Sequence, residues 1–488
     1  MSRRVVTGKL LLGINTMVLV AGCTVGPDYQ RPELGLPPNW SQPQQQEIET
    51  VSAGLKDWWT VLNDSVLEGL IERATQANPD LKESLFRIEE SRALRDFAGG
   101  RFAPKVDLAA SYTRSRDSEN NANSVPGLSG DQINAHSAGF DSSWETDLFG
   151  GIKRSVESSQ ASLEASVEDY RDTLITLYAE ITRNYVELRT IQARIQYALH
   201  NISSQQETLK LTKDRFNAGI APELDVIQAE MNVSNTESEV PSLRLAEIQA
   251  INRIAVLLGE YPQAFRPELE ARMHIPTPTK QIQAGLPAEL LRRRPDIRRA
   301  ERQLAAQVAM IGVAAADLYP SFSLTGAFHL QAAELSDVGN TSSRAYSFGP
   351  SLRWNVFDGK RIRNSIKIEE AKAEQTRVRY ERTVLSAVEE VENSLTAYAQ
   401  ESRRRDALDR SATASERSVE LVQTLYKNGL TDFQNVLDMQ RMLFLQQDKL
   451  AASRGQVVLN MVRIYKSLGG GWSGETSEPK KQGPEEDS

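Results

Sequence analysis

The sequence predicts an α+β membrane protein, in which each of two pairs of short amphipathic β-strands is followed by a very long helix. Two observations carry this prediction. Apolar residues recur at helical spacing over two stretches of more than sixty residues, and four shorter segments alternate between apolar and polar residues. A third observation is that the second half of the chain repeats the order of the first. We therefore predict an internally duplicated chain.

The composition limits the class of protein. The chain has 488 residues, of which 40% are hydrophobic, and a formal net charge of -8. This acidic balance argues against a nucleic acid as partner. The histidines are isolated in the sequence, without metal-ligand spacing. We find no nucleophile elbow, phosphate loop or dinucleotide fingerprint, so we expect no enzyme, no metal and no cofactor.

The N-terminus has the pattern of a secretory signal. Basic residues precede an apolar stretch over 10–20, and small residues follow it. The eleven residues of that stretch would rise about 16 Å as a helix, well short of a bilayer core of about 30 Å. We therefore predict a signal peptide over 1–22 rather than a membrane span.

The only cysteine of the chain, Cys23, stands at the expected cleavage point. The segment 19–23, Leu-Val-Ala-Gly-Cys, resembles the bacterial lipobox, which implies that Cys23 becomes an acylated first residue. The alternative is an incidental cysteine after an ordinary signal. Thr24 follows, where an aspartate tends to retain the resembling lipoproteins at the inner membrane, so the resemblance implies the outer membrane.

The internal repeat appears as matched residues at a constant spacing. Pairs 210 positions apart are Trp144 and Trp354, Gly219 and Gly429, Val226 and Val436, and Gly259 and Gly469. Each copy is predicted to run helix, two strands, very long helix, turn, helix. We predict a first repeat over 23–259, a second over 260–470, and a disordered tail over 471–488.

The long helices are the strongest local signal. Apolar residues fall at every seventh position from Val167 to Phe216, and other apolar residues fill the 3–4 spacing. This heptad pattern is typical of helices that pack against one another. Glycine and proline are absent from 152–217 and from 360–427, so each helix would span roughly 100 Å. Such helices need neighbours along their whole length.

Each long helix is predicted to end at a matched turn. Gly219 and Gly429 suit the left-handed position that follows a helix. After the second turn, Thr431 and Gln434 form a capping-box pattern. Two ordinary coiled-coil hairpins would account for these features equally well. The predicted hairpins cover 152–259 and 360–468.

The four alternating segments are predicted strands, at 105–113, 137–145, 321–330 and 345–356. Each is about ten residues long, which is the length and pattern of a transmembrane β-strand that faces lipid on one side and an aqueous lumen on the other. Two soluble hairpins are the alternative that alternation alone leaves open.

Four strands cannot close a barrel, because lipid does not tolerate their two open edges. A barrel needs at least about eight strands, so several copies must share one. Two copies would give a lumen that side chains fill, whereas three give about twelve strands and room for a channel. We predict a homotrimer with a twelve-stranded transmembrane β-barrel, continued by a periplasmic α-barrel of twelve helices.

Several motifs carry a specific resemblance over nearly the whole mature chain. The start, Cys23-Thr24-Val25-Gly26-Pro27-Asp28-Tyr29, resembles that of the outer-membrane efflux lipoproteins, the NodT-type branch of the TolC-like outer-membrane factors. Asn78-Pro79-Asp80 resembles their first helical region, and Arg293-Arg294-Pro295-Asp296-Ile297 resembles the start of their second repeat.

This resemblance implies a passive exit duct in the cell outer membrane that extends into the periplasm. The implied partners are outer-membrane lipid, a periplasmic adaptor protein and an inner-membrane transporter of the resistance-nodulation-division (RND) type, which together form a tripartite efflux pump. The alternatives are the outer-membrane duct of a type I secretion system and a structural coiled-coil lipoprotein scaffold.

The resemblance also implies functional residues at the helical tips. Asp225, Asp438 and Tyr426 match family positions that close a periplasmic gate. Asn435 replaces a further aspartate and Thr431 replaces an arginine found in some members, so we do not expect an Asp–Arg latch there. A first-turn carboxylate favoured by the helix dipole is the alternative for Asp225. The tip turns at Gly219 and Gly429 are the implied adaptor-docking sites.

Overall fold

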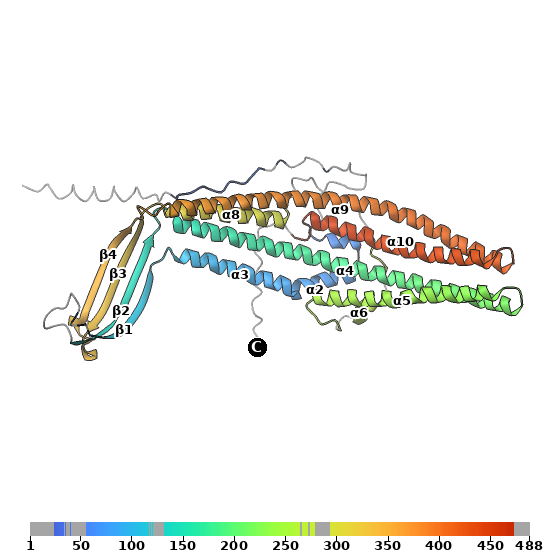
Figure 1. Cartoon of the computed structure of the whole chain (residues 1–488), viewed down its shortest axis with the longest axis horizontal. Helices are drawn as coiled ribbons and strands as arrows, with labels where there is room; N and C mark the ends of the chain where they lie inside the picture. Colours follow the sequence, from blue (N-terminus) through green and yellow to red (C-terminus); the bar gives the residue numbers. More distant parts are fainter. Residues whose placement is uncertain are drawn as a thin grey trace, which may run out of the picture. The chain divides into compact units, whose positions relative to one another are not determined.

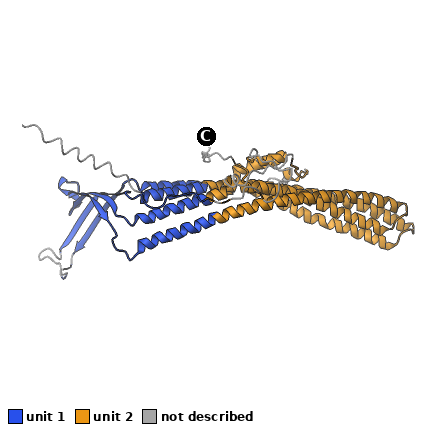
Figure 2. Ribbon diagram, turned by 90° about the horizontal axis from the view of Figure 1, so that it is seen from above, with its two compact units in different colours: residues 1–32, 88–166, 300–380 blue, residues 33–87, 167–299, 381–488 orange. Residues whose placement is uncertain are grey.

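The structure is a computed structural model and describes residues 24–33, 35, 40, 55–116, 118, 120, 131–263, 266–271, 274–278 and 293–472. The predicted signal peptide over 1–22 and the predicted acylation site Cys23 lie outside the described residues. The chain forms two compact units (Figure 2): unit 1 comprises 1–32, 88–166 and 300–380, and unit 2 comprises 33–87, 167–299 and 381–488. Each unit contains segments from both predicted repeats.

Helices and strands follow one another in a similar order in the two halves (Figure 1). The first half contains α2 (Ser65–Ala77), α3 (Pro79–Gly100), β1 (Lys105–Arg116), β2 (Gln132–Thr146), α4 (Gly151–Asn217) and α5 (Glu223–Leu257). The second contains α8 (Pro295–Ala316), β3 (Ser321–Ala332), β4 (Arg344–Arg353), α9 (Arg361–Lys427) and α10 (Phe433–Ser467). Short helices are η1 (Trp58–Leu62), α6 (Arg266–Glu270), η2 (Leu335–Asp337) and η3 (Thr341–Ser343). The predicted mixture of long helices and strands is confirmed.

Some strand ends differ from the prediction. Strand β2 begins at Gln132, earlier than expected, because 132–136 pairs with the end of β1 in the continuous register Arg116↔Gln132. Strand β4 ends at Arg353, and the expectation that it continues to 356 is wrong. Arg353 pairs with Ser321, the first residue of β3. The next ladder position would fall at Pro320, which has no backbone N–H to donate.

The four strands form one antiparallel sheet in the order β1-β2-β3-β4. The register aligns Leu108, Phe140, Phe328 and Tyr346 in one row across the sheet. The adjacent row, on the opposite face, aligns Asp107, Asp141, Ala327 and Ser347. The apolar row is largely open, with Leu108 71% and Tyr346 74% exposed. One face of the sheet is therefore apolar and uncovered within a single chain, and the other is polar.

The two repeats contain equivalent tryptophan contacts, and both lie in unit 1. The indole Nε1 of Trp144 donates to the carbonyl of Phe102 at 2.9 Å, and that of Trp354 donates to the carbonyl of Leu318 at 3.1 Å. Both carbonyls belong to the segment that leads from a helix into a strand. The repeated tryptophans thus tie the end of one strand to the helix that precedes its partner.

The main core of unit 2 is built around a buried tryptophan. Trp58 is 1% exposed and stacks on Tyr465 with 5.3 Å between ring centroids. Helix α2 begins directly after Asp64, because the carboxylate of Asp64 accepts hydrogen bonds from the first amides of the helix. The second carboxylate oxygen of Asp64 accepts from the Tyr185 hydroxyl at 2.7 Å. This buried bond attaches α2 to the long helix α4.

The disordered tail was predicted to begin at residue 471, which is too early. Gly471 and Trp472 are ordered, and Trp472 is 5% exposed. The guanidinium of Arg171 lies 4.5 Å from the Trp472 ring centroid, and that of Arg298 lies 5.4 Å away. A tryptophan that buries its ring under two cations gains enough contact to hold the chain in place. Residues 473–488 lie outside the described residues.

Candidate functional site

The tips of the two helical hairpins are built alike. Gly219 has φ +71° and Gly429 has φ +72°. The Ile220 amide donates to the Arg215 carbonyl at 2.9 Å, and the Leu430 amide donates to the Leu425 carbonyl at 2.9 Å. These bonds close the ends of α4 and α9 in the same way. A Cβ on either glycine would meet nothing within 4 Å, so the backbone conformation, and not space, requires glycine.

A cation–aromatic contact joins the two tips. The Arg215 guanidinium donates from Nη1 to the Tyr426 carbonyl at 2.6 Å and lies 4.6 Å from the centroid of the Tyr426 ring. Tyr426 is 3% exposed and packs against Phe433 with 5.8 Å between ring centroids. Arg215 belongs to the last turn of α4 and Tyr426 to the last turn of α9. The contact therefore fastens one hairpin end to the other.

Asp225 lies in the first turn of α5, close to this contact. Partial burial raises its pKa, the negative charge of Asp432 adds to the rise, and Arg215 opposes it. A raised carboxyl pKa means that the charged form is disfavoured in the folded tip. The resulting destabilisation is absent below the ordinary aspartate pKa, about 3.9, and becomes complete as the pH rises through the raised pKa.

Asn435 and Asp438 lie on the first two turns of α10, and both are exposed. The Asn435 side-chain amide donates to Thr431 Oγ1 at 2.9 Å, and Asp438 accepts from the Gln434 amide at 3.0 Å. The predicted capping box of Thr431 with Gln434 is wrong. Asp432 is the N-cap, and it accepts from the Asn435 backbone N–H at 3.1 Å. A carboxylate one residue later takes the cap because aspartate is as good a cap as threonine or better.

The structure thus brings some of the predicted tip residues together. Tyr426 lies in the contact between the hairpins, and Asp225 lies within electrostatic range of Arg215. Among the described contacts, Asp438 and Asn435 bond only to side chains or backbone at the start of α10. Arg215 was not among the predicted site residues. Its position in the last turn of a helix is common for a cation and gave no separate signal.

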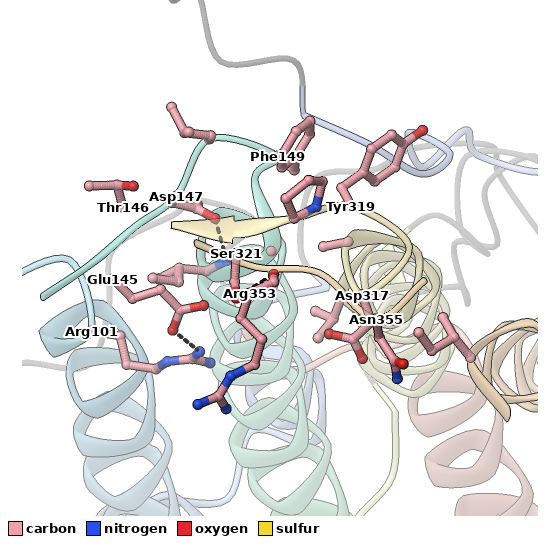
Figure 3. Close-up of a pocket in the computed structure, with 17 residues that line it drawn as sticks. Arg101, Glu145, Thr146, Asp147, Phe149, Asp317, Tyr319, Ser321, Arg353 and Asn355 are labelled. Atoms are coloured by element: carbon pink, nitrogen blue, oxygen red, sulfur yellow. Dashed lines mark hydrogen bonds and ion pairs between the residues drawn. The ribbon is translucent and has the colours of Figure 1, made fainter. Parts of the chain in front are cut away.

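A second feature is a cavity of about 320 Å³ in unit 1, where the strands meet the helices (Figure 3). Its charged wall includes Arg101, Glu145, Asp317 and Arg353. Arg101 donates to Glu145 at 3.4 Å. Burial raises the pKa of Asp317, and the charge of Glu145 adds to the rise. Glu145 and Arg353 come from strand ends, so the cavity begins where the sheet ends.

In the part of the chain that the structure describes, no group of three or more His, Cys, Asp or Glu side chains is placed to hold a metal ion. None of the helices in that part combines the length and the apolar character needed to cross a membrane.

A sheet with one uncovered apolar face, in a chain that also forms two long helical hairpins, is typical of outer-membrane channels. The family described as outer membrane efflux protein matches residues 70–260 and 286–470. The chain therefore belongs to the outer membrane efflux protein family, and it is an outer-membrane efflux channel. This is a family of transport proteins rather than of enzymes.

Individual relatives cover almost the whole chain. Nodulation protein T of Rhizobium leguminosarum bv. trifolii is 32% identical over 462 residues, 92% of this chain and 94% of the relative. Outer membrane protein OprJ of Pseudomonas aeruginosa is 30% identical, over 95% of this chain and 97% of its own length. The solved structure of the outer-membrane channel OprN has a TM-score of 0.83 at 36% identity, covering 92% of this chain and 100% of OprN.

Proposed function

We propose that three copies of the chain form one exit duct, in which twelve strands close a transmembrane barrel and twelve helices continue it into the periplasm. The single observation that carries this proposal is the sheet. Its order leaves β1 and β4 as edges, and its apolar face exposes Phe348 by 81% and Leu108 by 71%. Lipid can cover an apolar face, but it cannot satisfy the backbone groups of an edge strand. Neighbouring copies supply the missing partners.

The proposed duct is the outer part of a tripartite pump, and it passes substrates that a periplasmic adaptor and an inner-membrane RND transporter deliver. The tip turns at Gly219 and Gly429 form the proposed adaptor-docking surface. Apolar side chains lie open beside them: Ile220 is 66%, Leu224 is 60% and Leu430 is 72% exposed. Exposed apolar groups gathered at a tip favour a protein partner. Acyl chains on Cys23, after removal of 1–22, would anchor each copy, and the repeats would cover 23–259 and 260–470.

A purified sample distinguishes the duct from a coiled-coil scaffold. We expect the mature protein to remain trimeric in detergent, to require detergent even without acyl chains, and to conduct ions across a planar bilayer. Native mass spectrometry of the protein produced with and without acylation measures the first two properties. A protein that is monomeric and soluble in water once the acyl chains are absent would be a scaffold, and the duct proposal would be rejected.

The proposed gate uses Asp225, Tyr426, Asn435 and Asp438. In a trimer, three Asp438 carboxylates around a narrow axis would attract cations. We expect Asp438→Ala to reduce cation selectivity and block by divalent ions in planar bilayers. Reversal potentials under a salt gradient, with and without divalent ions, measure the change.

The matched control for this prediction is Glu416→Ala, which removes an exposed acid from α9. It changes the net charge by the same amount, and we expect it to leave selectivity as it is. Identical current–voltage curves for Asp438→Ala and the parent protein would exclude Asp438 from the gate.

A further inference from the structure

The first residues of the mature chain lie along unit 1 as an extended segment, here called the arm (residues 24–31). The arm begins beside the end of β2. The Val25 amide donates to the Phe149 carbonyl at 3.1 Å, and Lys153 Nζ donates to Thr24 Oγ1 at 3.1 Å. The arm is therefore attached by its backbone and side chains at the junction between β2 and α4.

Arg154, in the first turn of α4, is the centre of the contact. Its side chain is 4% exposed, although it carries a full charge. The guanidinium donates from Nε to the Val25 carbonyl at 3.1 Å and from Nη2 to the Gly26 carbonyl at 3.2 Å. Nη2 also contacts the Asp28 carboxylate at 2.7 Å. The fourth bond of the guanidinium runs from Nη1 to Glu157 in α4 at 2.8 Å. A buried guanidinium is stable only where its donors are satisfied, and the arm accepts three of these four bonds.

Glycines make this close approach possible. Gly26 has φ +88°, and a Cβ there would overlap the backbone of Gly312 in α8. A Cβ on Gly312 would lie 2.7 Å from Cγ of Arg154. A Cβ on Gly150 would lie 2.9 Å from the Thr24 Cα. At these three positions any larger residue would collide with the segment that it faces.

The far end of the arm is held by a second set of contacts. The Tyr29 ring packs against Ala161, Ala305 and Ala306, and the Arg302 guanidinium lies 5.5 Å from its centroid. Arg31 pairs with Glu301 at 2.8 Å. The surface of α4 and α8 that makes these contacts, here called the groove, therefore binds a glycine, an acid, an aromatic ring and a base in that order along the arm.

We propose that Arg154 and the groove between α4 and α8 are a receptor for this chain's own N-terminal arm, and that the receptor holds the acyl-bearing end of the mature chain at the base of strand β2. This inference rests on the proposed acylation of Cys23, which directly precedes Thr24. Acyl chains alone would leave the terminus free to move in the plane of the membrane. The groove fixes where the lipids enter it, beside the strand ends. The Gly26, Asp28 and Tyr29 pattern thereby acquires a physical explanation.

Thiol labelling of the full-length protein in detergent tests the receptor. An acylated Cys23 is a thioether, which forms no thiolate and does not react with a maleimide, so Thr24→Cys provides the only reactive thiol. We expect this thiol to label slowly in the otherwise unchanged protein. In Arg154→Ala it should label about tenfold faster or more, because several bonds to a charged group are lost.

Two further variants keep the test decisive. Asp28→Ala alters only the arm, since the Asp28 side chain is 86% exposed. It should also accelerate labelling, so it tests the receptor even if Arg154→Ala fails to fold. Arg363→Ala removes an exposed arginine from α9 in the same unit and should leave the labelling rate unchanged. Equal rates in the Thr24→Cys protein with and without Asp28→Ala would overturn the receptor proposal.

The parent protein without Thr24→Cys separates the two proposals. It should not react with the maleimide. A reaction would show a free Cys23 thiol and would refute acylation. The Thr24→Cys comparison, repeated in protein carrying Cys23→Ser behind an ordinary cleaved signal, would still measure arm docking.

Discussion

Arg215→Ala is expected to loosen the hairpin tips strongly. The variant loses the 2.6 Å bond to the Tyr426 carbonyl and the contact with the Tyr426 ring. A hydrogen bond to a charged group and a cation–π contact together contribute about 2–4 kcal/mol. Local opening of the tip should therefore become about thirtyfold more frequent or more. Hydrogen exchange of peptides covering the ends of α4 and α9, followed by mass spectrometry, measures this opening.

The same turn of α4 offers a matched control. Lys213 pairs with Glu230 at 2.8 Å, and both side chains are about half exposed, at 48% and 51%. Such surface pairs contribute about 0–1 kcal/mol, so Lys213→Ala should leave exchange at the tips nearly unchanged. If Arg215→Ala exchanged no faster than Lys213→Ala, the contact between Arg215 and Tyr426 would not hold the two tips together.

The second large effect is expected from Gly455→Val in α10. Gly455 is buried, and a Cβ there would overlap Thr190 Oγ1 and lie 3.0 Å from Thr190 Cγ2 in α4. A valine adds two further methyl groups to this crossing, and overpacking of this kind costs about 1–3 kcal/mol, occasionally more. We expect a lower free energy of unfolding and a lower temperature of thermal unfolding, which circular dichroism in detergent measures.

Two variants separate overpacking from an effect of valine on the helix itself. Ala452 is exposed on the same helix, so Ala452→Val introduces the same β-branched residue without the clash and should cost less than about 1 kcal/mol. Thr190→Ala should recover part of the stability lost in Gly455→Val, because it removes the two atoms that the new side chain meets first. Equal losses in Gly455→Val and Ala452→Val would show that the crossing is not tightly packed.

The ends of the long helices were predictable because their signals are local. Heptad spacing predicted helices over 152–217 and 360–427, and the structure has them at Gly151–Asn217 and Arg361–Lys427. The turns followed from Gly219 and Gly429, since a glycine after a helix favours the left-handed conformation that both adopt.

Local signals were weaker where a neighbouring strand decides the outcome. Residues 132–136 do alternate, but in the opposite phase to 137–145, so Ile133 and Ala135 fall on the polar face of the sheet. They extend β2 nevertheless, because β1 offers them partners. The end of β4 at Arg353 depends on Pro320, which directly precedes β3 and has no backbone N–H to donate. Trp472 was assigned to the disordered tail because the composition around it is polar, whereas Arg171 and Arg298 from distant segments cover its ring.

The site was predicted only in part for the same reason. Tyr426 and Asp225 could be assigned to the tips by their distance from a turn glycine. Their partner Arg215 could not, because it lies 211 positions from Tyr426 in the chain. Likewise Arg154 lies 126 positions from Asp28, and the sequence showed only an ordinary arginine near a helix start.

The sequence by itself therefore determined the type of the elements, the length of the two longest helices and the two matched turns, because each follows from the spacing of residues close together in the chain. The tertiary structure alone decided which groups these arginines contact, namely the carbonyl and ring of Tyr426 for Arg215 and the arm for Arg154. The physical reason is that such contacts depend on how helices pack side by side, and the period of an amphipathic helix specifies a face but not the residue that a neighbouring helix will present to it.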